Sequence, residues 1–149
     1  MELTTRPYSE LVPNEIIDLV EARLLQLGGQ LQHRGEILAI SPVVHRFTPG
    51  LYCREIRLPA GSINTSRIHK TEHPFVISQG HCRVYRNTNE WEDIRAPHFG
   101  VTTPGTRRVV IAFEETIWTT FHPTTLTDLL EIEDALLEPW ENPLVKETA

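Results

Sequence analysis

The sequence predicts a mainly β domain, a sandwich or barrel of short strands with one helix before it and one after it. The first observation is a series of short apolar runs between residues 37 and 121, each bounded by proline or glycine. The second is that no segment of crossover-helix length separates these runs, which argues against a parallel sheet. The third is that helical periodicity occurs only before and after them. Together these observations favour a sandwich or barrel.

The first helix is predicted for residues 15–27. Asn14 precedes it as a good N-cap, and the pair Gly28-Gly29 follows it as a stop signal. Apolar residues repeat at helical spacing along one side, namely Ile16, Ile17, Val20, Leu24 and Leu27. Such a stripe is typical of a helix that packs against its own domain or a partner subunit. Residues 1–30 are therefore assigned to an N-terminal arm and helix.

Strands and a second helix are predicted to follow. The strands are expected at residues 37–40, 51–58, 75–78, 81–86, 108–113 and 116–121, so that a barrel spans residues 36–122. A C-terminal helix is expected at residues 125–138, because Thr125 and Asp128 form a cap-like pattern. An apolar stripe follows them, and Pro139 ends the helix.

Length and composition fit one domain that spans residues 1–149, since domains commonly have about 100–200 residues. No run approaches the roughly 20 apolar residues of a membrane span, and the N-terminus lacks a secretory signal pattern. We therefore expect a cytoplasmic protein with no membrane partner.

Cys53 and Cys82 lie in strand-like runs and are expected as reduced thiols. A net charge of −6 opposes binding to nucleic acid.

One segment, residues 61–80, combines glycine, arginine and histidine at a distinctive spacing. Gly61 is followed after five residues by Arg67, and His69 comes two positions later. Three further residues lead to His73, and six more lead to Gly80. This spacing resembles the first motif of the cupin family, which reads Gly, five residues, His-x-His, three or four residues, Glu, six residues, Gly. Arg67 stands at the place of the first histidine, and His73 at the place of the glutamate.

The second cupin motif has a weaker counterpart. The turn Pro104-Gly105 is followed after two residues by Arg108, at the place of the last metal-binding histidine. The resemblance covers roughly residues 51–113. The chain also resembles small cupin-like proteins of bacteriophage genomes, an impression to which residues 116–122 contribute.

The cupin resemblance implies a double-stranded β-helix, or jelly-roll, barrel with a pocket at one end. Metal-dependent cupins hold iron, manganese or a related divalent ion with three histidines and one glutamate. Arginine has no lone pair for a metal, so Arg67 and Arg108 argue against that site here, and no cofactor is the leading expectation. The alternative metal set is His69, His73 and His122, for iron, manganese, zinc or nickel.

Arginine forks bind carboxylates and phosphates, so the pocket is predicted to hold a small polar or anionic molecule. The predicted ligand-binding residues are Arg67, His69, His73, Arg108, Trp118 and His122. No catalytic residue is assigned. Strand alternation puts Trp118 and His122 on one face, but the sequence leaves open which face lies inside. The remaining histidines are expected at the surface or in loops, namely His33, His45, His81 and His98.

Three functions remain open at this point. The first is a non-catalytic binding module for a small polar or anionic molecule. The second is an enzyme, either a metal-dependent cupin that uses His69 and His73 or a metal-free one. The third is a structural or assembly protein of a phage particle, in which the helices and residues 4–13 make subunit contacts. The resemblance also implies a homo-oligomer, a dimer formed through the sheets, located in the host cytoplasm if a phage encodes it.

Overall fold

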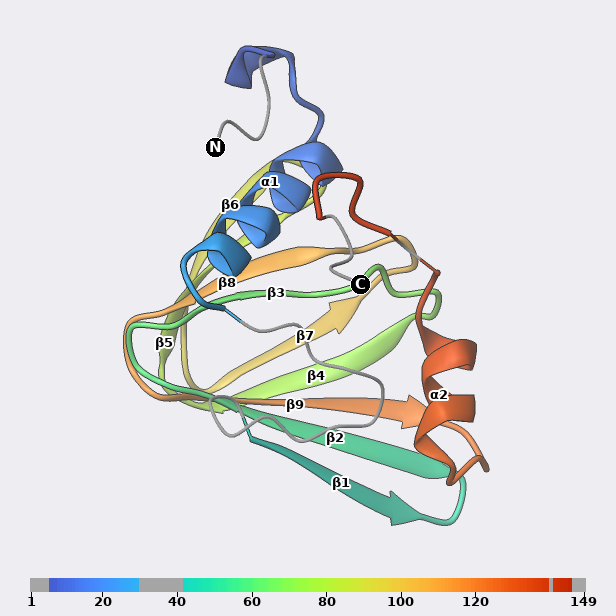
Figure 1. Cartoon of the computed structure of the whole chain (residues 1–149). Helices are drawn as coiled ribbons and strands as arrows, with labels where there is room; N and C mark the ends of the chain where they lie inside the picture. The colour runs from blue at the N-terminus through green and yellow to red at the C-terminus, as the bar shows by residue number, and fades with distance from the viewer. Residues whose placement is uncertain (1–5, 30–41, 140, 146–149) are drawn as a thin grey trace.

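The computed structural model describes residues 6–29, 42–139 and 141–145, which form two facing antiparallel sheets and two α-helices (Figure 1). In chain order the elements are a 3-10 helix (Tyr8–Glu10), α1 (Pro13–Gln26), β1 (Val43–Thr48), β2 (Leu51–Leu58), β3 (Ile63–Thr65), β4 (His73–Gln79), β5 (His81–Arg86), β6 (Glu90–Arg95), β7 (His98–Thr102), β8 (Arg108–Ala112), β9 (Thr116–Pro123) and α2 (Leu129–Leu136). Among these described segments, no helix is long and apolar enough to cross a bilayer.

The two sheets have the strand orders β1-β2-β9-β4-β7 and β3-β8-β5-β6, and every neighbouring pair is antiparallel. The chain passes from the first sheet to the second between β4 and β5, at Gly80. Gly80 has a φ of +105°, and a Cβ there would lie 2.5 Å from the carbonyl oxygen of Glu115. Only glycine fits such a backbone, which gives the second framing glycine of the motif a physical reason.

The inner faces of both sheets enclose the apolar core of the barrel. Alternate residues of each strand point into it, as expected for half-buried strands. Its buried members are Leu58, Phe75, Ile77, Cys82, Val84, Ile94, Val110, Ala112 and Trp118. Both cysteines of the chain carry free thiols, as the sequence predicted.

Helix α1 packs on the outer face of the four-stranded sheet, where Ile16 and Ile17 contact Tyr85 and Val109. The predicted N-cap at Asn14 is wrong, because the helix already begins at Pro13. Proline suits the first helical position, since it has no N–H that would need a partner. The N-cap is Val12, and its N–H donates to the Glu15 carboxylate at 3.3 Å.

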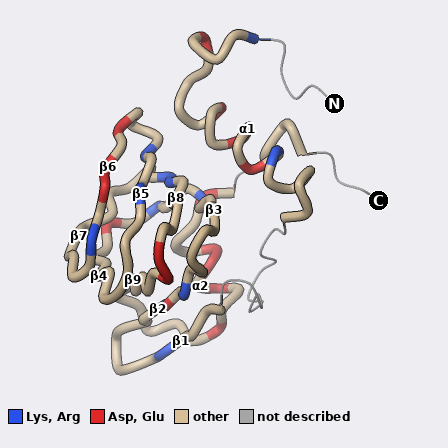
Figure 2. Tube along the Cα trace, turned by 90° about the vertical axis from the view of Figure 1, so that its left-hand side faces the viewer, with Lys and Arg blue, Asp and Glu red and all other residues tan. Residues whose placement is uncertain are grey.

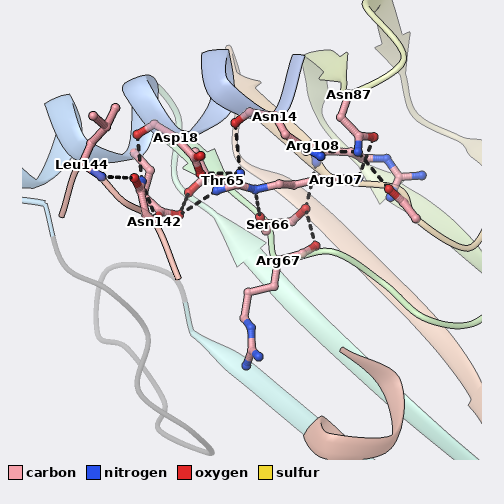
Figure 3. Close-up of polar contacts among 12 residues, drawn as sticks. Asn14, Asp18, Thr65, Ser66, Arg67, Asn87, Arg107, Arg108, Asn142 and Leu144 are labelled. Carbon is pink, nitrogen blue, oxygen red and sulfur yellow. Dashed lines mark hydrogen bonds and ion pairs between the residues drawn. The ribbon is translucent and has the colours of Figure 1, made fainter. Parts of the chain in front are cut away.

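A buried arginine, Arg107, joins α1 to the four-stranded sheet through an ion pair (Figure 3). Arg107 has 1% of its surface exposed, and its guanidinium donates to the Asp18 carboxylate at 2.7 Å. Glu21 lies 3.5 Å from another nitrogen of the same guanidinium. The neighbouring Arg108 points to the opposite face of β8, as alternation in a strand requires.

Helix α2 is shorter than the predicted segment 125–138. It begins after Asp128, whose carboxylate accepts from the N–H groups of Leu130 at 2.8 Å and Glu131 at 3.3 Å. Asp128 is therefore the N-cap, and residues 125–127 precede the helix. In Figure 1, α2 lies beside the ends of β2 and β9, at one end of the barrel.

The predicted strands 51–58 and 81–86 are confirmed with their bounds, and the other described ones shift by one or two residues at an end. Four strands were not predicted, namely β1, β3, β6 and β7. The predicted strand 37–40 lies outside the described residues.

Candidate functional site

The inner face of the five-stranded sheet becomes polar at the end covered by α2. Tyr52 on β2 pairs in register with His122 on β9, and His73 on β4 pairs with Thr102 on β7. The ring centres of His73 and His122 are 4.2 Å apart, and those of Tyr52 and His122 are 5.6 Å apart. His73, Thr102 and His122 are buried. These four side chains form one row across the sheet, which places His122 inside the barrel.

His69 reaches the same cluster from the segment between β3 and β4. Its backbone N–H donates to the carbonyl of Thr106 at 3.1 Å, and its carbonyl accepts from Gly105 at 2.8 Å. The ring centres of His69 and His73 are 5.1 Å apart. The structure thus brings together the three predicted histidines, which we call the histidine cluster: His69, His73 and His122.

The segment that follows α2 closes the barrel over the histidine cluster. His69 forms an isolated antiparallel bridge with Leu137. On either side of it, the N–H of Lys70 donates to Leu136 at 2.8 Å, and the N–H of Glu138 donates to Ile68 at 2.9 Å. Backbone pairing therefore ties the motif segment to the C-terminal segment.

Each ring of the histidine cluster has one nitrogen bonded to a protein oxygen. Nδ1 of His69 lies 3.2 Å from the Thr106 carbonyl, and Nδ1 of His73 lies 3.1 Å from the Thr71 carbonyl. Nε2 of His122 lies 2.8 Å from the Thr120 hydroxyl. On the other side of two rings, Nε2 of His73 and Nδ1 of His122 are buried with no hydrogen-bond partner among the described residues.

Burial keeps the histidine cluster uncharged. It lowers the pKa of His69 to about 4 and the pKa of His122 to about 3, and it also lowers the pKa of His73. Positive neighbours add to this effect, since Arg108 acts on His73 and Arg54 acts on His122. The rings are therefore neutral near pH 7. A cationic role for them in binding an anion does not fit this site.

Arg108 is the buried cation of the site. It has 6% of its surface exposed, and its guanidinium donates to the Thr102 hydroxyl at 3.1 Å. The guanidinium carbon lies 5.0 Å from the ring centre of Phe75 and 5.5 Å from that of Trp118. Burial lowers its pKa to about 10, which leaves it charged. Within the described ranges, no carboxylate lies at ion-pair distance from Arg108.

A groove of about 430 Å³ reaches Arg108 between the edge strands β6 and β7. Its lining residues are Phe75, Arg86, Thr88, Glu90, Glu92, His98, Phe99, Gly100, Val101, Thr103, Thr106 and Arg108. Arg86 is paired with Glu92 at 2.8 Å and with Glu90 at 3.3 Å. Figure 2 shows acidic and basic positions interspersed along the strands. Arg108 is thus the arginine of this groove that forms no ion pair with a described carboxylate, although the charge of Glu92 acts on it at longer range and opposes the lowering of its pKa.

Arg67, the other arginine at a cupin ligand position, lies apart. It is exposed, and its guanidinium donates to the backbone carbonyl of Glu138 at 3.1 Å. Its side chain points away from Arg107 and Arg108 in Figure 3. The neighbouring Ile68 is buried instead of Arg67. The expectation that Arg67 and Arg108 share one pocket does not hold.

Residues of β1 and β2 also belong to the site, although sequence reasoning missed them. His45 was expected at the surface, but it is half-buried on β1, with Nδ1 2.6 Å from the Tyr52 hydroxyl. Arg54 is close enough to lower the pKa of His45, His69 and His122. Alternation along residues 51–58 gave a signal, because Tyr52 and Arg54 share a face with the apolar Leu58.

The other histidines have different places. His98 lies on β7 and lines the groove, although it was expected in a loop or at the surface. His81 lies on β5 and is bonded to the Asp93 carboxylate. His33 lies outside the described residues.

No protein-family model matches the chain, and no curated protein matches its sequence. Solved structures do match. Salicylate 1,2-dioxygenase from Pseudoaminobacter salicylatoxidans, in complex with gentisate, has a TM-score of 0.52 at 17% identity, over 87% of this chain and 34% of that one. Oxalate decarboxylase from Lactobacillus farciminis, in a formate complex, has a TM-score of 0.53 at 12% identity, over 61% of this chain and 31% of that one.

The fold is that of a cupin. Both matched enzymes are cupin-fold proteins, and the two facing sheets described above have the same jelly-roll architecture. At this level of identity the likeness extends to the fold alone. The chain also spans only about a third of the length of these matched structures.

The histidine cluster offers part of a donor set for a divalent metal of the cupin kind. Neutral imidazole is the form that binds a metal, and ligating histidines usually bond their other nitrogen to a protein oxygen. The unpartnered nitrogens of His73 and His122 fit that pattern. Over the described part of the chain, no three potential ligand side chains already stand together in coordinating geometry. A metal here would therefore have to draw the three rings closer together.

Proposed function

We propose that this chain is a cupin-type binding protein that holds a small anion, such as a carboxylate, at Arg108 without converting it. The observation that carries the proposal is the buried guanidinium of Arg108, which forms no ion pair with a described carboxylate, although Glu92 lines the same groove. An unpaired buried charge is costly, and proteins normally offset it with a counter-charge. In the second cupin motif, Arg108 stands at the place of the last metal-binding histidine. The loss of that ligand favours binding over catalysis.

The surroundings of Arg108 orient it for this task. The ring faces of Phe75 and Trp118 lie against the guanidinium, and the Thr102 hydroxyl accepts one of its N–H groups. The remaining N–H groups can form a bidentate fork with a carboxylate. Because the site is largely shielded from water, such a charged hydrogen bond is stronger than it would be at the surface. The groove between β6 and β7 gives a small molecule a route to it.

Isothermal titration calorimetry of the untagged, chelator-treated chain with acetate, succinate and phosphate tests the proposal. We expect at least one of these anions to bind. Arg108→Gln should weaken that binding by at least about 30-fold, since removal of one partner of a buried charge pair costs about 2–5 kcal/mol. Arg67→Gln is the matched control, because it removes an exposed arginine and should leave affinity unchanged. Binding that survives Arg108→Gln unchanged in a folded variant would refute the assignment.

The second candidate function is that of a metal-dependent cupin enzyme, and the unpartnered nitrogens of His73 and His122 favour it. The residues that would hold the ion are His69, His73 and His122. A divalent ion bound there would supply Lewis-acid chemistry at the barrel interior.

Elemental analysis of freshly purified, untagged protein separates the two candidates. The binding-protein proposal expects no stoichiometric iron, manganese, zinc or nickel, even after the growth medium is supplemented. About one tightly held ion per chain that is lost in His73→Phe would instead make the enzyme the leading function. His81→Phe is the control, because His81 lies on β5 and bonds Asp93, outside the histidine cluster.

A further inference from the structure

Two buried ring nitrogens without a hydrogen-bond partner among the described residues, one on His73 and one on His122, lie near the buried charge of Arg108. Nδ1 of His73 is bonded to the Thr71 carbonyl at 3.1 Å. Because a carbonyl oxygen only accepts, Nδ1 carries the hydrogen of the neutral ring and Nε2 carries the lone pair. Nε2 of His73 is buried without a partner among the described residues, so the group that it lacks is an O–H or N–H donor. Nδ1 of His122 is likewise buried and unpartnered.

These groups meet inside the barrel, where Arg108 reaches from β8 of the four-stranded sheet to the inner face of the five-stranded sheet. Arg108 donates to the Thr102 hydroxyl at 3.1 Å, and Thr102 is the register partner of His73. Side chains at directly opposite positions of an antiparallel pair start about 4.5–5.5 Å apart. The His73 and His122 ring centres are 4.2 Å apart. Thr102, which accepts from the Arg108 guanidinium, and the two unsatisfied ring nitrogens therefore follow one another from β7 through β4 to β9.

We infer that the ligand is a small hydroxy acid, whose carboxylate binds Arg108 and whose hydroxyl donates to Nε2 of His73 beside His122. The inference rests on the proposed function, because it requires Arg108 to hold the carboxylate. A plain carboxylic acid would satisfy Arg108 and leave Nε2 of His73 buried and unpaired. A plain alcohol would satisfy His73 and leave the charge of Arg108 unmatched. A buried site that is built to pair a hydroxyl discriminates strongly against the analogue that lacks it.

The charges around the histidine cluster favour a hydroxyl over an ammonium group as the donor. The guanidinium of Arg108 bonds the hydroxyl of Thr102, which is the register partner of His73. A permanent positive charge therefore stands beside His73. A neutral hydroxyl avoids the repulsion that an ammonium group would meet, so a hydroxy acid fits better than an amino acid.

Calorimetry with acids that differ by one hydroxyl tests the inference. The probes are glycolate against acetate, lactate against propionate, and malate against succinate, each titrated into the full chain after chelator treatment. We expect the hydroxy member of at least one pair to bind at least about 10-fold more tightly, the factor that one lost buried hydrogen bond produces. His73→Phe keeps a ring of similar size and removes the acceptor. It should abolish this preference while the affinity for the plain acid stays within about 3-fold.

Two variants complete the design. His122→Phe should also reduce the preference, and it replaces His73→Phe if that protein does not fold. His81→Phe is the control, and it should keep the full preference because His81 lies outside the histidine cluster.

The outcomes distinguish this inference from the proposed function. If no acid of any pair binds the unmodified chain, the proposed function itself fails. If both members of every pair bind equally and both depend on Arg108, the proposed function stands and the hydroxy-acid inference is overturned. A preference that persists in both histidine variants overturns it as well. So does a preference that appears only when zinc is added, because the two nitrogens would then hold a metal instead of a hydroxyl.

Discussion

At the scale of single residues, strand alternation gives two adjacent arginines opposite tasks. Arg107 points outward beneath α1, where carboxylates of that helix meet its charge. Arg108 points inward, where the ring faces of Phe75 and Trp118 and one hydroxyl surround it. The same stretch of backbone therefore supplies a structural cation to the outside of the barrel and the proposed binding cation to the inside.

The histidine cluster predicts how stability depends on pH in the chelator-treated protein. Burial lowers the pKa of His69 to about 4 and of His122 to about 3, below the ordinary value of 6.5. At pH values between these lowered pKa values and 6.5, the two histidines bind protons in the unfolded chain but not in the folded chain. Stability is therefore complete above about pH 6.5 and falls as the pH falls toward 4.

Urea unfolding at pH 7 and pH 5 measures this loss. We expect His69 and His122 each to lower the unfolding free energy by about 2 kcal/mol over that interval. His122→Gln should make the drop smaller by about that amount. An unchanged drop in this variant would show that other groups control acid sensitivity.

The position of a residue in the site could be predicted from the sequence where a motif or strand alternation determined it. The motif spacing identified His69 and His73, and alternation grouped Trp118 with His122. The prediction that Arg67 lies in the pocket was wrong. Its segment is not a strand, and Ile68 is the residue buried there. Arg54 belongs to no motif, so alternation with Tyr52 and Leu58 was the one sequence signal for its face, and its place beside the histidine cluster followed from tertiary structure.

At the scale of elements, the four strands that sequence reasoning missed are the four edges of the two sheets: β1, β3, β6 and β7. An edge strand is paired on one side only, and it needs less apolar sequence than a central strand. Glu90–Arg95 is largely charged, and Ile63–Thr65 has only three residues. Hydrophobic periodicity in the sequence therefore identified the central strands and missed the edge strands.

The attachment of α1 depends on its buried ion pair. Arg107→Met would leave the Asp18 carboxylate, with 3% of its surface exposed, buried without its cation. Removal of one partner of a buried pair costs about 3–5 kcal/mol, so we expect a loss of that size in urea unfolding. Arg46→Ala breaks an exposed pair with Glu55 and should cost less than about 1 kcal/mol. Equal effects of the two substitutions would contradict this account of α1.

At the scale of the whole molecule, the barrel is open along the edges β6 and β7 and closed by the C-terminal segment at one end. The cupin architecture was predictable because turn residues, strand spacing and the motif glycines all pointed to it. The comparisons extend to the fold alone, so the cytoplasmic location and the phage-encoded group stay predictions. The ligand could not be read from the sequence, because it depends on side chains from four strands that meet only after folding.

We also predict that the chain forms a homodimer through its sheets. The exposed apolar residues Phe99 and Val101 lie on the edge strand β7, with 66% and 48% of their surfaces exposed, and they also line the groove, so a second copy would border the route to Arg108. An edge of this kind is suited to association with a second copy. Light scattering after size-exclusion chromatography should give twice the chain mass of 17.1 kDa. Phe99→Glu should give the monomer mass, and a wild-type monomer at all concentrations would refute the prediction.

The stacking of Trp118 beneath Arg108 gives the protein an optical reporter of its own. Trp118 is buried and lies 4.6 Å from the ring centre of Phe75, whereas Trp91 has 58% of its surface exposed. Caesium ion in the buffer quenches the fluorescence of an exposed indole and spares a buried one. The emission that survives the quencher therefore includes the indole against the guanidinium. A change in that emission on adding an anion would report occupancy of the barrel without any attached dye.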